Sequence, residues 1–86
     1  MSAISYDEAL VRSLAVIEKV CRKRADEHSR FIEDLDLDSI DLIELLSEME
    51  QEFGIRFRED QLRSLSVVGD ATRCVLDQLS RRERTA

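Results

Sequence analysis

The sequence predicts an all-α fold, a small bundle of three main helices plus one short helix. The 86-residue chain contains no proline and only two glycines, which disfavours a sheet with many tight turns. Apolar residues recur three and four positions apart in three separate stretches, the spacing of amphipathic helices. The length is that of one domain, so we expect a single domain over residues 1–86, with its core over about 5–80 and a frayed basic tail over 81–86.

The first helix is expected to begin after Ser5. Ser5 and Glu8 fit a capping box, in which each side chain accepts a hydrogen bond from the other residue's backbone N–H. Four residues then form one apolar stripe: Leu10, Leu14, Ile17 and Cys21. The basic residues 22–24 are expected in the last turn, where positive charge suits the helix dipole.

Residues 25–37 lack a steady helical period and are predicted to form a loop with inward-facing Phe31, Leu35 and Leu37. Asp38 is expected to cap a second helix whose first residue is Ser39. Its core-facing residues recur at helical spacing and precede a stop at Gly54: Leu42, Leu45, Leu46, Met49 and Phe53.

The last third of the chain predicts an extended loop, a short helical turn and a final helix. Ile55 and Phe57 alternate with arginines, but a lone strand would have no partner, so we expect a loop with Phe57 turned inward. Residues 59–64 can form the short turn. Ser66 is the expected cap of the last helix, whose inner face would carry Val68, Ala71, Val75 and Leu79.

Charge is distributed unevenly along the chain. Residues 31–60 carry 2 basic and 11 acidic side chains, whereas the flanking thirds have net charges of +1 and +2. Such a middle third would repel a nucleic acid and attract a protein with a basic patch, although a merely solvated acidic face remains an alternative. No apolar run approaches the ~20 residues that span a membrane, and the N-terminus does not resemble a signal peptide. We therefore expect a cytoplasmic protein without membrane insertion. Cys21 and Cys74 are expected to be small apolar side chains rather than a disulfide.

The segment Phe31–Phe53, FIEDLDLDSIDLIELLSEMEQEF, carries a family resemblance. It resembles the attachment segment of acyl carrier proteins, whose signature is Asp-Ser-Leu, or a close variant, at the head of the second helix. Here that signature reads Asp38-Ser39-Ile40. The surrounding residues that match are Phe31, Asp34, Leu35, Asp41, Glu44, Leu45 and Phe53, and residues 65–71 resemble the family's entry into its last helix.

The resemblance implies an acyl-carrier-like bundle that carries 4′-phosphopantetheine, derived from coenzyme A, on Ser39. It implies a carrier of acyl groups as thioesters rather than an enzyme. The expected partners are a phosphopantetheinyl transferase and acyl-loading, synthase or acyltransferase enzymes with basic docking patches, of fatty acid, polyketide or specialised lipid biosynthesis. The transferase would supply the base, because His28, the only histidine, lies in a different predicted segment. We expect a monomer.

The docking surface is predicted on the second helix beside Ser39. Because Leu45, Leu46 and Met49 face inward, the opposite side should present an apolar strip flanked by carboxylates. Core burial is the alternative for the two isoleucines, and simple solubility for the acidic residues. The residues expected to contact partners are Asp38, Ile40, Asp41, Ile43, Glu44, Ser47 and Glu48.

Three departures from the family pattern favour a specialised carrier over the housekeeping carrier of fatty acid synthesis. Asp36 stands where the family often has glycine, Phe57-Arg58 replaces a common Ile-Pro, and Ser47 replaces a bulkier apolar residue. The alternatives are an aminoacyl or peptidyl carrier and an unmodified acidic helical adaptor. The alternating aspartates 34, 36 and 38 do not form an EF-hand, because the required glycine and glutamate positions hold Ser39 and Leu45, so no metal site is expected.

Overall fold

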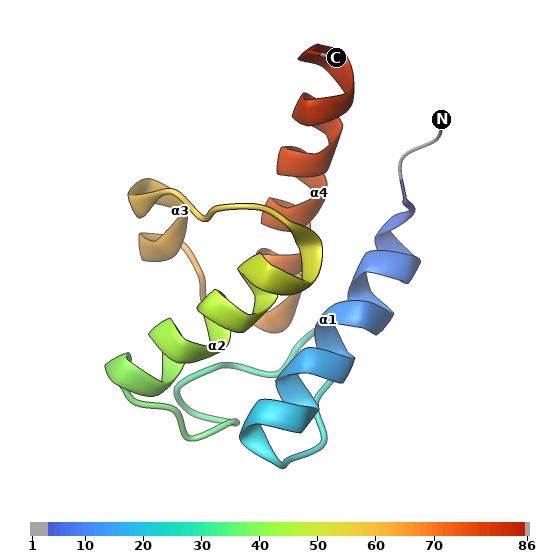
Figure 1. Cartoon of the computed structure of the whole chain (residues 1–86). Helices are drawn as coiled ribbons and strands as arrows, with labels where there is room; N and C mark the ends of the chain where they lie inside the picture. Colours follow the sequence, from blue (N-terminus) through green and yellow to red (C-terminus); the bar gives the residue numbers. More distant parts are fainter. Residues whose placement is uncertain (1–3, 86) are drawn as a thin grey trace.

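The computed structural model describes residues 4–85, and of residues 82–85 it describes the backbone alone. This part of the chain contains four helices joined by loops (Figure 1). They are α1 (Tyr6–Cys21), α2 (Ser39–Phe53), α3 (Glu59–Arg63) and α4 (Val68–Thr85). Within this range no strand forms, and the extended backbone makes one isolated antiparallel bridge, between Arg30 and Val67. The predicted all-α bundle of three main helices and one short helix is confirmed.

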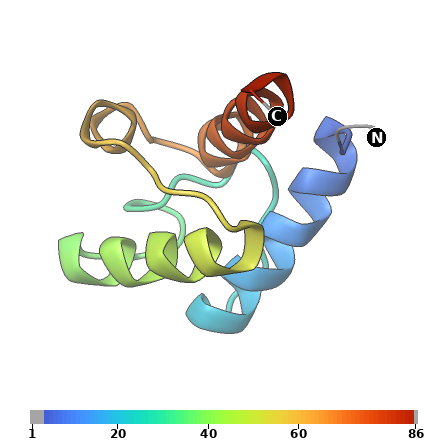
Figure 2. The same cartoon turned by 45° about the horizontal axis from the view of Figure 1, so that its top comes forward.

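The long helices pack around α1, which contacts both α2 and α4. In both views α3 lies on the side of the bundle away from α1 (Figures 1 and 2). The core takes side chains from all three long helices and from both long loops. Its buried apolar residues are Ile17, Phe31, Leu35, Leu37, Leu45, Leu46, Met49, Phe53, Ile55, Phe57, Val68, Ala71 and Val75.

The start of α1 agrees with the prediction, but its end does not. Ser5 and Glu8 form the capping box. The helix ends at Cys21, and Arg22 adopts a left-handed conformation (φ 60°), so residues 22–24 do not form its last turn. Glu18 explains the early end, because its side chain accepts a hydrogen bond from the Ala25 N–H at 2.9 Å and draws the chain back along the helix. On the inner face, the smaller Ala9 and Ser13 are fully buried, whereas the predicted Leu10 and Leu14 are only half-buried.

The connection between α2 and α3 is the predicted extended loop. Gly54 ends α2 in the left-handed conformation (φ 68°), which glycine adopts without steric cost. The Phe57 N–H then donates to a carboxylate oxygen of Glu50 at 2.8 Å, and both Ile55 and Phe57 are buried. Side chains alternating inward and outward, rather than a strand, account for the alternating sequence.

The start of α4 is capped by Asp70 and not, as predicted, by Ser66. The Asp70 carboxylate accepts hydrogen bonds from the Ser66 and Val67 N–H groups at 2.9 and 3.1 Å, and it also pairs with Arg73 at 2.8 Å. Burial alone would raise the pKa of Asp70, but these hydrogen bonds and Arg73 lower that pKa below its ordinary value. The helix continues to Thr85, and fraying of the tail stays a prediction.

The loop over residues 22–38 is fastened to the start of α4. The Phe31 N–H donates to the Ser66 carbonyl and the Val68 N–H to the Ser29 carbonyl, both at 3.0 Å. The Gly69 N–H also donates to the Glu27 carbonyl, at 2.9 Å. A side chain at position 69 would bring its Cβ within 3.3 Å of that carbonyl, so glycine permits this close approach. The loop that leads to α2 is therefore held at its middle by backbone hydrogen bonds.

Replacing Asp70 with alanine is expected to destabilise the protein by about 1 kcal/mol at pH 7, the usual net contribution of an intramolecular hydrogen bond. Because the pKa of Asp70 is lowered in the folded state, its contribution is present above the unfolded pKa of about 4 and is lost as the pH falls through the folded pKa. Urea unfolding of both proteins at pH 7 and pH 3 measures this difference. The control is Asp77→Ala, which removes an exposed ion pair with Arg81 on the same helix and should change stability by less than ~0.5 kcal/mol. An Asp70→Ala loss of equal size at both pH values would contradict the role of the charge.

Candidate functional site

The start of α2 is built by two carboxylates. Asp38 is the N-cap, and its side chain accepts a hydrogen bond from the Asp41 N–H at 2.8 Å. Asp41 reciprocates by accepting from the Asp38 N–H at 3.4 Å, which completes a capping box. Ser39 is the first helical residue, as the sequence predicted, and it is exposed.

The capping box satisfies only some of the free backbone N–H groups at the start of α2. The Asp41 N–H is already satisfied by the Asp38 carboxylate, whereas the N–H groups of Ser39 and Ile40 have no acceptor among the described residues 4–85. The Ser39 hydroxyl likewise makes no hydrogen bond to them. The site therefore combines an available hydroxyl with two neighbouring negative charges.

The approach to Ser39 depends on an unusual backbone conformation at Asp36. Asp36 has φ 61°, in the left-handed region that suits glycine, and aspartate is among the few other residues that visit it readily. The Leu35 and Leu37 side chains on either side of it are both buried. The Leu37 N–H donates to the Phe31 carbonyl at 3.1 Å. The predicted burial of Leu35 and Leu37 is confirmed, and these two anchors fix the position of Asp38 and of the start of α2.

The residues predicted to face partners are all exposed, on α2 or, for Asp38, at its N-cap. Ile40 and Ile43 have 69% and 61% of their surface exposed, so the alternative of core burial is wrong for both. Ile40 and Ile43 form an exposed apolar strip on α2, and Ser47, one turn after Ile43, is exposed beside it. Within the described residues, no cation pairs with the four carboxylates beside this strip, which are Asp38, Asp41, Glu44 and Glu48.

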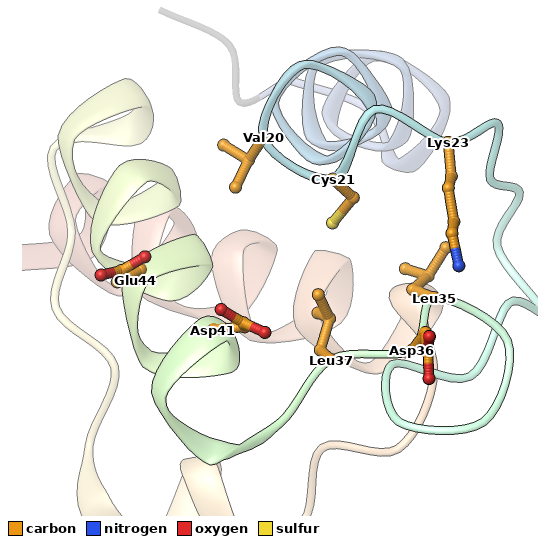
Figure 3. A pocket seen from close by; sticks show the side chains of 8 residues that line it. All are labelled: Val20, Cys21, Lys23, Leu35, Asp36, Leu37, Asp41 and Glu44. Atoms are coloured by element: carbon orange, nitrogen blue, oxygen red, sulfur yellow. The ribbon is translucent and has the colours of Figure 1, made fainter.

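A cavity between the end of α1 and the start of α2 was not predicted from the sequence. It has a volume of about 280 Å³. In Figure 3 the Cys21 sulfur points into the space between the two helices, and Leu37 and Asp41 lie across from it. Burial, followed by the nearby Asp41 charge, raises the pKa of the Cys21 thiol, so this thiol stays protonated and weakly reactive. Val20, 37% exposed, also lines this cavity. It is an apolar residue outside the predicted stripe of α1, and this was the signal in the sequence from which a surface feature here could have been predicted.

Comparison with known proteins decides the family. The family described as "Phosphopantetheine attachment site" matches residues 8–75. An acyl carrier protein of Acidothermus cellulolyticus is 32% identical over 72 residues, which cover 80% of this chain and 86% of that protein. The chain belongs to the acyl carrier protein family. A second acyl carrier protein, from Saccharopolyspora erythraea, is 33% identical over 75 residues, which cover 87% of this chain and 75% of that protein. A third, from Sulfurovum sp., is 41% identical over 49 residues, 57% of this chain, and the chain spans only 65% of that protein's length.

The residues at the start of α2 fit the prosthetic group of the acyl carrier protein family, 4′-phosphopantetheine. An exposed hydroxyl without a hydrogen-bond partner is what a phosphodiester link requires, and Ser39 supplies it near the middle of the matched region. The hydroxyls of Ser5 and Ser64, in contrast, are engaged by backbone groups. When bound, the group supplies a thiol on which an acyl chain is held as a thioester.

Proteins of the acyl carrier family are carriers rather than enzymes. Among the described residues no three His, Cys, Asp or Glu side chains gather to hold a metal ion. His28 lies in the loop, and 86% of its side chain is exposed. None of the described helices combines the length and the apolar character needed to cross a bilayer.

Proposed function

We propose that this protein is an acyl carrier protein whose 4′-phosphopantetheine arm is attached to Ser39. The observation that carries the proposal is the exposed, hydrogen-bond-free hydroxyl at the first residue of α2, inside the region that matches the family. Acyl groups would be held on the arm as thioesters and presented to enzymes of fatty acid, polyketide or specialised lipid biosynthesis. The chain itself contributes the position of the cargo and the identity that partners recognise, whereas the partner enzymes contribute the chemistry.

The partners proposed are a phosphopantetheinyl transferase and the enzymes that load, extend or transfer the cargo. The exposed Ile40 and Ile43, with Ser47 beside them, form an apolar strip next to Ser39. Four adjoining carboxylates have no cation partner among the described residues: Asp38, Asp41, Glu44 and Glu48. They favour a partner with arginine and lysine side chains around an apolar centre. Such complementarity accelerates encounter and selects the partner.

We further propose a cytoplasmic location. Cys21 and Cys74 are both free thiols, which is compatible with a reducing compartment.

Intact-mass measurement tests the proposal directly. The protein is incubated with coenzyme A and a broad-specificity phosphopantetheinyl transferase, and its mass is then compared with that of the untreated protein. A carrier gains the mass of one phosphopantetheine, and peptide mapping finds the group on the segment that contains Ser39. An unmodified acidic adaptor gains nothing, and this outcome would refute the proposed function.

A further inference from the structure

The cavity at Cys21 continues into a groove along α1 and α2. A second cavity, of about 270 Å³, adjoins the first, and Val20 lines both. We call the two together the α1–α2 groove. The inference rests on Val16, Lys19 and Val20 from α1 and on Asp41, Glu44 and Glu48 from α2. Three further charged residues also line the groove: Lys23, Asp36 and Glu52.

The groove lies on the opposite flank of α2 from Ser39. At about 100° per residue, the directions of Asp41, Glu44 and Glu48 all lie roughly 140–200° around the helix from that of Ser39. The isoleucine strip lies between these two directions. The three carboxylates therefore form a ridge with the isoleucine strip on one side and the α1–α2 groove on the other.

Opposite charges face each other across the groove without pairing. Lys19 and Glu48 line the same cavity, yet neither takes part in an ion pair with a described residue. Beside the groove, Arg12 pairs with Glu52 at 3.0 Å and covers the Phe53 ring at 4.5 Å. The groove is thus an open channel with an acidic wall on α2, a basic residue on α1 and aliphatic side chains between them.

We infer that the α1–α2 groove docks an amphipathic basic helix of a partner enzyme. An aliphatic side chain of that helix packs on Val16 and Val20, its lysines or arginines pair with the carboxylate ridge, and an acidic residue pairs with Lys19. This inference rests on the proposed function for the kind of partner, an enzyme that acts on the arm. It adds α1 as a second recognition element beside α2.

Charge favours this occupant over a second copy of the chain. The protein has a net charge of −6, so two copies repel each other, whereas a basic helix is attracted to the ridge. The groove is lined by side chains of both α1 and α2, so a partner helix lying in it would contact both helices. Because the groove and the isoleucine strip share the ridge, one partner can contact both surfaces.

A synthetic peptide tests the inference on the protein without its arm. The probe is a helical peptide of leucine and lysine with one glutamate, and its control has the same composition shuffled so that no face is apolar. In ¹⁵N NMR titrations we expect the probe, and not the shuffled peptide, to shift the amide signals of Val16, Lys19 and Val20. Shifts confined to Ile40 and Ile43 would overturn the inference.

A matched pair of variants tests the proposed aliphatic contact at Val20. Val20→Asp is expected to weaken peptide binding about tenfold, because it places a charge where the aliphatic contact is made. Val11→Asp makes the same change at a more exposed valine of the same helix, 66% against 37% exposed, outside the groove, and should leave binding unchanged. Equal effects of the two variants would overturn the inference.

The remaining outcomes are separable. Self-association of the peptide-free protein in sedimentation, abolished by Val20→Asp, would assign the groove to a second copy and overturn the partner-helix inference. The proposed function is judged separately by the mass gain of the wild-type protein, because peptide binding does not require the arm. A protein that gains the arm but shows no groove shifts keeps the function and loses the inference.

Discussion

The Ser39→Ala variant is expected to gain no phosphopantetheine under conditions in which the wild-type protein gains one. Alanine lacks the hydroxyl to which the phosphate would be joined. The folded structure should be preserved, because the Ser39 side chain makes no hydrogen bond with the described residues and alanine is well tolerated in a helix. Intact mass measures the modification, and the thermal unfolding midpoint verifies the fold.

Ser66→Ala is the matched control for this prediction. Ser66 is also an exposed serine whose hydroxyl makes no hydrogen bond with the described residues, and it lies before α4, outside the predicted docking surface. This variant should gain one phosphopantetheine as the wild-type protein does. A mass gain in Ser39→Ala, or its loss in Ser66→Ala, would contradict attachment at the first residue of α2.

Phe31→Ala is expected to lower the free energy of unfolding by about 3–5 kcal/mol, the usual cost of removing a buried aromatic ring. Phe31 has only 1% of its surface exposed and lies in the core beside Leu35. Such a loss is a large part of the ~5–15 kcal/mol that stabilises a typical domain. Urea unfolding followed by far-ultraviolet circular dichroism measures the change.

The neighbouring Ile32 provides the control for Phe31. It is 53% exposed, and Ile32→Ala should cost less than about 1 kcal/mol. Both variants keep the backbone hydrogen bonds of the loop, so a difference between them reports the buried ring. Equal losses would mean that the loop contributes to stability through its backbone alone and that Phe31 does not anchor it.

Most of the fold was predictable from the sequence because its signals are local. The Ser5–Glu8 pair, three positions apart, and the capping residue Asp38 mark the starts of α1 and α2 in the structure. The apolar spacing of α2 likewise identified Leu45 and Met49 as core residues. Local signals of this kind also gave the position of Ser39 and the exposure of the residues around it.

The features that escaped prediction depend on contacts between distant or competing groups. The end of α1 is set by Glu18, which reaches the Ala25 backbone beyond the helix. At α4, a serine and an aspartate four residues apart could both act as the cap, and only the structure shows that Asp70 does so. The α1–α2 groove needs the relative placement of two helices, which periodicity within either helix does not contain.

The two carboxylates at the head of α2 bear on how a tethered group moves. A phosphodiester joined to Ser39 would add a further negative charge near Asp38 and Asp41, and like charges repel each other. With the Asp41 N–H already bonded to Asp38, only the Ser39 and Ile40 N–H groups remain at this end of the helix to bind the phosphate. We expect the repulsion to turn the tether outward into solvent, where its free end can swing between successive enzymes.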